Sequence, residues 1–236
     1  MAKIYVLQHH PVENLGSIAD ALEGAALAWQ YVRVHEGQPV PTEMKGAGGL
    51  IVMGGPMGVY QTDRYPFLRD EMALINDAIR QNRPVLGVCL GAQIVAAALG
   101  AKVDRNPRGK EIGWHPIRLE PAAKQDRLMR DLPETLTPFH WHGDIVELPA
   151  GAVSLAASEK TPCQAFRYGD KTYGFQFHFE VTSTSVSAMA DAFVKDLNRE
   201  QINADEMIAK SAQFAPPLAQ IADKVFSRWA SPIQGT

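Results

Sequence analysis

A cysteine stands between two glycines in the segment PVLGVCLGAQIVAAALG, residues 84–100. Glycines at positions 87 and 91 permit a sharp turn from a strand into a helix, which is one way to expose a nucleophile. The helix would begin beside Cys89, and its positive end would lower the thiol pKa from about 8.5 to roughly 3.5–7.5. The backbone N–H of Leu90 would then face an oxyanion. A cysteine that only fills space between strand and helix would show the same pattern. A catalytic thiol also needs a base, so the histidines decide between the two interpretations.

A histidine and a glutamate that could serve this thiol occur in YGFQFHFEV, residues 173–181. If this segment is a strand, His178 and Glu180 share one face and the alternating phenylalanines pack on the other. The carboxylate could then orient an imidazole that acts as base toward a thiol and as acid toward a leaving amine. A strand whose polar face meets solvent is the alternative.

A glycine-rich loop follows the apolar run in IVMGGPMGVY, residues 51–60. Glycines at the carboxyl end of a strand let backbone amides approach a phosphate or a developing oxyanion. The segment fits neither a Walker A loop nor a dinucleotide fingerprint, so it gives little support to nucleotide binding. A plain turn is the alternative for this loop taken alone.

Taken in order, the three segments resemble the class I, triad-type glutamine amidotransferases, which carry a GGP loop, a G-x-C-x-G-x-Q elbow and a later Q-F-H-P-E segment. The resemblance extends from the first strand to about residue 185. It is greatest to stand-alone members similar to the amidotransferase domain of GMP synthetase, through GGPMGVY, EIGWHPI and HWHGD. Phe179 replaces the usual proline, and Gly58 stands where many members have serine. Both differences could change the shape of the pocket on the side of the acceptor.

The resemblance implies a role for each matching residue. Cys89 would be the nucleophile, His178 the general acid and base, and Glu180 the carboxylate that orients it. The amides of Gly55 and Leu90 would form the oxyanion hole. No cofactor and no metal are implied. The residues expected to contact substrate are Gly54, Gln93, His142, Gly143 and Asp144.

Apolar runs alternate with helical patterns over the first hundred residues, with expected strands at 3–8, 29–34, 49–55 and 84–89 and expected helices at 15–26 and 67–82. This order predicts a doubly wound α/β fold with a mostly parallel open sheet flanked by helices, flavodoxin-like in layout. Shorter segments after Gly100 predict an antiparallel extension. We expect one amidotransferase-like domain over residues 1–236, with a core of about 1–200 and a helical extension of about 201–236.

The composition fits a globular protein, with 236 residues, 46% hydrophobic residues and a formal net charge of -3. A small negative charge gives no indication of a basic surface that would bind nucleic acid or an anionic membrane. No segment approaches the ~20 apolar residues of a membrane span, so a cytoplasmic protein is expected. Two cysteines without CxxC spacing argue against a disulfide framework or a zinc ribbon.

Two further groups of histidines have chemistry to offer. His140 and His142 alternate in PFHWHGD, and with Asp144 they could hold a metal ion. The resemblance instead places this segment beside the glutamine site, so no metal site is expected. His9 and Glu13 follow the first strand and could line an acceptor pocket, although a solvated loop is the simpler interpretation.

The expected reaction is hydrolysis of the γ-amide of glutamine through a cysteinyl γ-glutamyl thioester, as in a glutamine amidotransferase or glutaminase-type hydrolase. A synthetase subunit that accepts the ammonia is the implied partner. One alternative is a γ-glutamyl peptidase or transferase that acts on γ-glutamyl amines or peptides. The other is a non-catalytic regulatory module. The oligomeric state is not indicated by the sequence.

Overall fold

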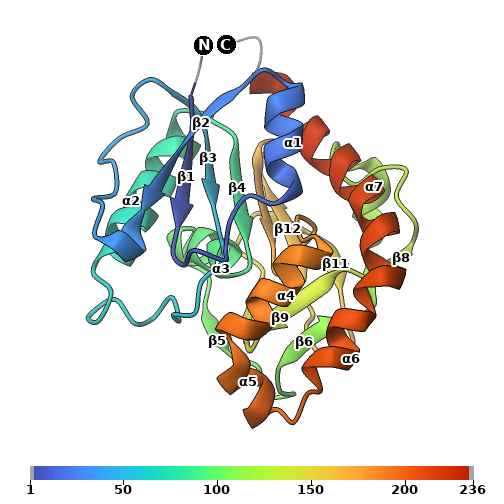
Figure 1. The fold of residues 1–236 in the computed structure, drawn as a ribbon. Coiled ribbons are helices and arrows are strands. Elements are labelled where there is room, and N and C mark those ends of the chain that lie inside the picture. The colour runs from blue at the N-terminus through green and yellow to red at the C-terminus, as the bar shows by residue number, and fades with distance from the viewer. Residues whose placement is uncertain (1–2, 234–236) are drawn as a thin grey trace.

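A nine-stranded mixed sheet forms the centre of the computed structural model, which describes residues 3–233 (Figure 1). The first five strands in spatial order pair in parallel, and the remaining pairs are antiparallel. In that order the strands are β2 (Ala28–Arg33), β1 (Lys3–Gln8), β3 (Ala47–Val52), β4 (Val85–Val88), β13 (Thr172–Phe175), β12 (Ala165–Tyr168), β11 (Ala152–Ala157), β7 (Ile117–Leu119) and β8 (Thr135–Leu136).

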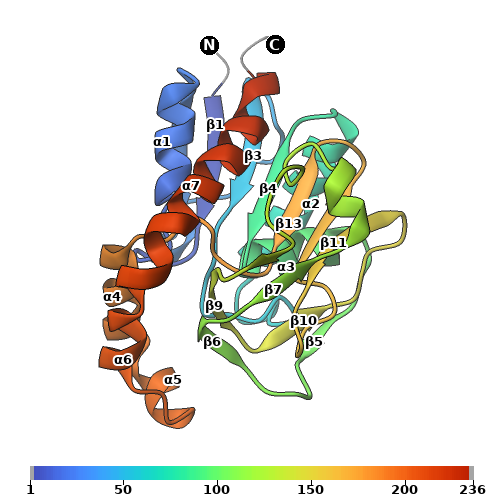
Figure 2. The same ribbon diagram turned by 90° about the vertical axis from the view of Figure 1, so that its right-hand side faces the viewer.

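Helices cover both faces of the parallel strands (Figure 2). On one face α1 packs beside α7, and on the other α2 packs beside α3. No helix within residues 3–233 is both long enough and apolar enough to cross a bilayer. The α-helices are α1 (Ser17–Gly24), α2 (Phe67–Arg80), α3 (Leu90–Ala98), α4 (Ser183–Ala192), α5 (Val194–Arg199), α6 (Ala204–Ala209) and α7 (Ser211–Ala230), and the 3₁₀ turns are Val34–Glu36, Pro121–Gln125 and Ser231–Ile233.

The burial of the central strands explains their sequences. Every residue of β3 and β4 is buried, whereas residues of the edge strand β2 are mostly accessible. Strands covered on both faces need continuous apolar runs rather than alternation. This confirms the predicted α/β fold with a parallel core, an antiparallel extension and C-terminal helices, in a sheet that is mixed as a whole.

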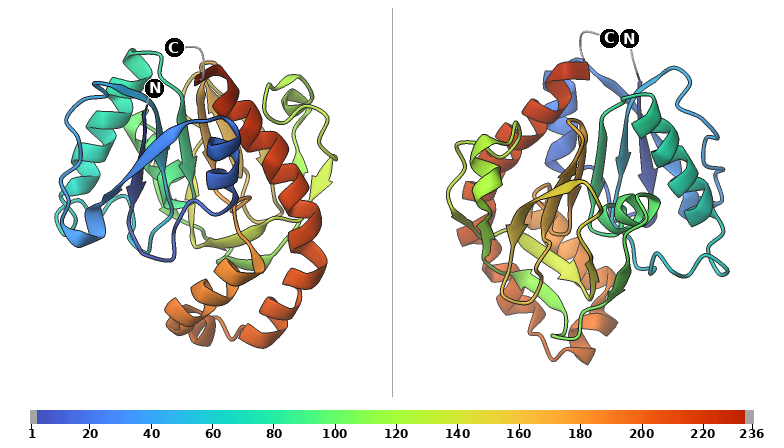
Figure 3. Two further views of the ribbon diagram at one scale, coloured as in Figure 1. Left: turned by 45° about the horizontal axis from the view of Figure 1, so that its top comes forward. Right: turned by 180° about the vertical axis from the view of Figure 1, so that it is seen from behind.

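Two small antiparallel pairs lie beyond the carboxyl ends of the parallel strands. They are β5 (Val103–Arg105) with β10 (Asp144–Val146), and β6 (Glu111–Trp114) with β9 (Phe139–His142). The short helices α4, α5 and α6 gather at the same end of the molecule (Figures 1 and 3). Most of the chemistry-bearing residues noted in the sequence therefore meet at this end.

The segment 173–181 is a strand only in part, which corrects the sequence prediction. β13 ends at Phe175, where its neighbour β4 also ends, because Phe175 pairs with Val88, the last residue of β4. The chain then turns to β9, where the backbone N–H of His178 donates to the carbonyl of Phe139 at 2.8 Å. The phenylalanines are buried as expected, but His178 and Glu180 are buried too, at 0% and 3% exposure. The alternative of a solvent-facing polar strand is therefore wrong.

Candidate active site

Cys89 occupies a tight turn between β4 and α3, where it is the N-cap residue with φ 51° and ψ -108°. A non-glycine residue in this region stores strain of about 1–3 kcal/mol, and such strain clusters at functional sites. Its backbone N–H donates to the carbonyl of Phe175 at 2.8 Å. The flanking glycines are needed for close approach: a side chain on Gly87 would come within 2.6 Å of the Gly91 backbone, and one on Gly91 would overlap the carbonyl of Val52. The turn therefore has the geometry predicted for a nucleophile elbow.

His178 and Glu180 form a buried pair, with His178 Nδ1 2.6 Å from Glu180 Oε1. Each residue is also held through its backbone: His178 on Phe139, and Glu180 through its carbonyl, which accepts from the N–H of Ser17 at 3.0 Å. The imidazole is thus oriented by a carboxylate and by two separate elements, β9 and α1.

The thiol of Cys89 lies 3.5 Å from the carbonyl oxygen of Trp141, which belongs to β9. Burial raises the pKa of this thiol, and the opposing interactions with His178 do not overcome it. The sequence prediction of a lowered pKa is therefore wrong for the resting site, because desolvation of the thiolate outweighs the helix terminus. Burial also disfavours the charged form of His178, but Glu180, Cys89 and Glu13 together raise the pKa of His178 well above 6.5.

The glycine loop after β3 lies against buried side chains on both sides. His9 Nδ1 is 3.2 Å from the carbonyl of Gly54, and His9 Nε2 is 3.0 Å from a carboxylate oxygen of Glu71 in α2. A side chain on Gly55 would meet His9 at 2.6 Å and Leu90 at 2.9 Å. The His9–Glu71 pair therefore fixes the carbonyl of Gly54 and, with it, the peptide that carries the N–H of Gly55.

Glu13 brings a further carboxyl group to this site, since a side chain on Gly54 would overlap Glu13 Oε2. Glu13 is 5% exposed and His9 is 2% exposed, so the interpretation of these residues as a solvated loop is wrong. Burial raises the pKa of Glu13, while His178 opposes the shift. From the sequence, Glu13 could be placed only after the first strand, with no sign that its carboxyl group would be buried.

A pocket of about 520 Å³ opens onto Cys89. Gln93 reaches it from α3, and the HGD segment reaches it from the junction of β9 and β10. His142 Nδ1 lies 3.2 Å from the carbonyl of Asp144, and this contact fixes the orientation of the ring. Sequence-predicted residues that line the pocket are Gly55, Cys89, Leu90, Gln93, His142, Gly143 and Asp144.

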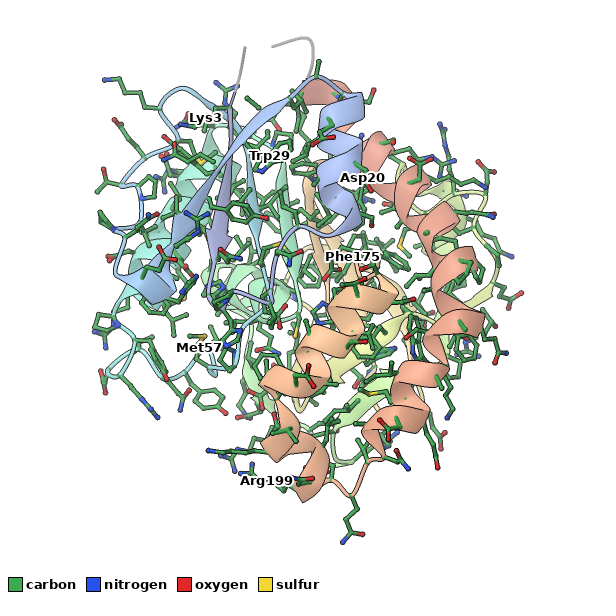
Figure 4. The ribbon with its side chains drawn as sticks, viewed as in Figure 1. Lys3, Asp20, Trp29, Met57, Phe175 and Arg199 are labelled. Carbon is green, nitrogen blue, oxygen red and sulfur yellow. The ribbon has the colours of Figure 1, made fainter. Side chains whose placement is uncertain are left out.

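Charged residues that no sequence motif singled out also line the pocket. Lys110 precedes β6, and its ammonium lies 2.9 Å from the carboxylate of Asp196 in α5. Arg105 and Arg199 also line the pocket. Met57 and Arg199, both labelled in Figure 4, are in the lower half of that view, at the end where the short helices gather. These residues are far apart in the chain, so no local motif could have linked them to Cys89.

Most of the chain matches one known protein family. The family model described as glutamine amidotransferase class-I matches residues 12–197. The chain belongs to the class I glutamine amidotransferase family. The matched range includes the elbow, the glycine loop and the His178–Glu180 pair, and it ends within α5.

Relatives of this family member include both short and long proteins. It is 35% identical over 190 residues to a Salmonella typhimurium protein named as glutamine amidotransferase-like protein YfeJ, with 79% of each chain covered. It is 36% identical over 138 residues to the glutamine-hydrolysing GMP synthase of Thermosipho africanus, covering 58% of this chain and 25% of that enzyme. The chain therefore spans about a quarter of the length of that synthase.

Solved structures extend the likeness to the C-terminal helices. A glutamine amidotransferase from Thermotoga maritima superimposes with a TM-score of 0.89 at 29% identity, covering 97% of this chain and 98% of the other. A glutamine amidotransferase from Methylobacillus flagellatus gives a TM-score of 0.88 at 30% identity, with coverage of 97% and 94%. The helices beyond residue 197 thus lie within the range of the structural similarity.

Proposed function

We propose that this class I amidotransferase hydrolyses the γ-amide of glutamine through a thioester on Cys89. The observation that carries the proposal is the meeting of three parts around Cys89: its strained turn lines one pocket together with Gly55 of the glycine loop, and its thiol interacts with the imidazole of the buried His178–Glu180 pair. A nucleophile, an oriented base and backbone donors are the parts that acyl transfer requires.

In the first half of the reaction, His178 takes the proton of the Cys89 thiol, and the sulfur attacks the γ-carbonyl carbon of glutamine. The oxyanion of the tetrahedral intermediate is held by the N–H groups of Gly55 and Leu90. His178, oriented by Glu180, gives a proton to the leaving nitrogen, and ammonia departs. One oxyanion donor of this kind contributes about 3–4 kcal/mol to lowering the barrier.

In the second half, His178 takes a proton from water, and the resulting hydroxide equivalent attacks the γ-glutamyl thioester. The second tetrahedral intermediate collapses to glutamate and restores the thiol of Cys89. The buried Glu180 carboxylate stabilises the imidazolium in both halves without itself accepting a proton. Two easier steps thus replace one difficult hydrolysis.

The pocket also contains groups that suit the remainder of glutamine. Gln93 is 4% exposed and lines the pocket one turn along α3 from the thiol. Its amide can both donate to and accept from a carboxamide. Gly143 and Asp144 line the facing wall. We assign these residues, with Gly54, to substrate binding and to placement of the γ-carbon near sulfur.

Hydrolysis or transfer of γ-glutamyl amines is the second candidate, and Glu13 is the observation that favours it. Its carboxyl group lies beside Gly54 at the pocket, where its oxygens could accept hydrogen bonds from an amine leaving group. A purely regulatory module is less well supported, because the thiol, the imidazole and the carboxylate are all present. In an amidotransferase the ammonia would pass to a synthetase subunit.

An amine-release assay separates these functions. We expect ammonia release from glutamine, measured by coupled oxidation of NADH with glutamate dehydrogenase, to exceed amine release from a panel of γ-glutamyl dipeptides. Rapid release from the dipeptides with none from glutamine would favour the second candidate. No release from either substrate, with or without a candidate synthetase, would support the regulatory module.

Replacing Glu180 by glutamine should slow turnover roughly 10²- to 10⁴-fold, because the imidazolium would lose its carboxylate partner. The pH dependence gives a separate readout. Burial acts to lower the pKa of His178, but Glu180 raises it. Removing that carboxylate should therefore move the pKa of His178, as seen in kcat/KM, to lower pH. A pH–rate profile from pH 5 to pH 10 in roughly half-unit steps would measure it. An unchanged profile would contradict this role of Glu180.

Replacing Gln93 by alanine should lower kcat/KM for glutamine about 10- to 30-fold, since a buried hydrogen-bonding partner is lost. Gln81, an exposed residue at the end of α2, offers a matched control. Steady-state kinetics of Gln93→Ala and Gln81→Ala would show a deficit in the first and none in the second. Equal kinetics for the two variants would remove Gln93 from the binding site.

A further inference from the structure

We propose that Glu111, His140 and His142 form a binding site for a divalent cation of the zinc type, outside the reacting groups. One ligand atom from each side chain lies within 4.8 Å of the others, and all three residues are buried. Asp144, the third ligand that the sequence suggested, instead offers its backbone carbonyl to His142 at 3.2 Å. Glu111 takes its place because it is the strand partner of His142 in the β6–β9 pair.

The two imidazoles are already held in the orientation that a metal needs. His140 Nε2 lies 3.2 Å from the carbonyl of His115, and His142 Nδ1 lies 3.2 Å from the carbonyl of Asp144. A carbonyl oxygen only accepts, so each of these nitrogens must carry the proton of its neutral ring. Metal-binding histidines commonly use the second nitrogen in this way.

The remaining ring nitrogens therefore point lone pairs at each other. His140 Nδ1 and His142 Nε2 are 3.4 Å apart, with no proton between them when both rings are neutral. Glu111 Oε2 lies 3.6 Å from the same nitrogen of His142. Three electron-rich atoms thus converge on one buried point, an arrangement that a cation would stabilise.

The hydrogen-bond donors around Glu111 do not supply a positive charge. Its carboxylate accepts from Ser158 at 2.7 Å, from Thr161 at 2.5 Å and from Gln164 at 3.0 Å, all neutral groups. A buried carboxylate is usually paired with a cation or coordinates one. The nearby lysine, Lys110, directs its ammonium to Asp196 instead, at 2.9 Å.

Gln164 supplies the fourth ligand when its amide is turned over. Its Nε2 lies 3.0 Å from Glu111 Oε2 and 3.4 Å from His142 Nε2, whereas its Oε1 is buried without a hydrogen-bond partner. Turning the amide over would place Oε1 among the other ligand atoms. Ligand atoms about 2.0–2.1 Å from a tetrahedral zinc lie roughly 3.3 Å apart. The atoms of His140 and Glu111 lie 3.4 Å and 3.6 Å from His142 Nε2, close to that spacing.

The location points to a structural rather than a chemical role for the cation. It would join β6 to β9 through Glu111 and His142, which are register partners. Between the two histidines, the carbonyl of Trp141 contacts the Cys89 thiol at 3.5 Å. A bound cation would therefore fix the strand that borders the thiol, while its ligands remain buried.

Zinc titration calorimetry of the Cys89→Ser protein tests the proposal, because this background removes the competing catalytic thiol. We expect one Zn²⁺ per chain with Kd below roughly 1 µM. Adding His140→Ala should weaken binding at least about 100-fold. His115→Gln, in the same background, is the matched control. The His115 ring packs edge-on against that of His140, but its Nε2 bonds the carbonyl of Ile112 at 2.8 Å and it contributes no ligand atom to the cluster, so zinc binding should persist.

The result that would overturn the proposal is a folded Cys89→Ser protein that binds no Zn²⁺ up to about 100 µM, or that binds it equally after His140→Ala. If His140→Ala does not fold, Co²⁺ added to the Cys89→Ser protein decides. Visible d–d absorption of a tetrahedral nitrogen and oxygen site is expected, and its absence refutes the site. Neither measurement depends on glutamine hydrolysis.

Discussion

Replacement of Cys89 by alanine is expected to reduce ammonia release from glutamine roughly 10⁴- to 10⁶-fold, to near the background rate. The reason is that the proposed route passes through a thioester, for which alanine offers no atom. Loss of this small side chain should leave the fold intact, since the turn is held by backbone contacts with Phe175 and by the close approach of the two glycines. Coupled ammonia assays with circular dichroism would measure both effects.

Cys163 provides the matched control for this experiment. It is also buried, at 5% exposure, but it does not line the pocket, and burial raises its pKa to about 12. Cys163→Ala should therefore keep most of the turnover. Substantial glutamine hydrolysis by Cys89→Ala, or an equal loss in the two variants, would contradict a thioester on Cys89.

Replacement of Gly91 by alanine should cost about 3 kcal/mol or more of unfolding free energy and remove activity as well. The added methyl group would overlap the carbonyl oxygen of Val52, which is fixed in the buried strand β3. Relief of the overlap requires α3 to move away from the sheet, and Cys89 would move with it. Thermal unfolding should show a fall of at least about 6 °C in Tm.

Gly24 is the control glycine, because nothing lies within 4 Å of a side chain built there. It ends α1, and Gly24→Ala should change stability by no more than about 0.5 kcal/mol. A Gly91→Ala protein with unchanged Tm and full activity would show that β4 and α3 do not need this close approach.

The parts of the site that could be predicted from the sequence are local. The Cys89 turn depends on residues two positions away on either side, and the His178–Glu180 pair depends on a spacing of two. The central strands could also be predicted from the sequence, because a strand buried on both faces is an uninterrupted apolar run, as in β3. In each case the signal and its physical cause lie within a few residues of each other.

The parts that could not be predicted depend on contacts between distant segments. The burial of Glu13 requires the approach of Gly54, and the His9–Glu71 pair joins the residue that follows β1 to α2 across 62 positions of the chain. The raised pKa of Cys89 arises from burial, which the helix-terminus argument did not include. The end of β13 at Phe175 was set by the end of its neighbour β4, a fact about pairing rather than about residues 176–180.

The central claim is that Cys89 attacks the γ-carbon of a glutamine bound in this pocket. The most direct measurement is intact-mass analysis after incubation with the diazoketone analogue of glutamine, followed by peptide mapping. The account predicts one adduct per chain, located on Cys89, suppressed by excess glutamine and absent in Cys89→Ala. A folded protein that remains unmodified, or that is modified at Cys163 instead, would contradict it.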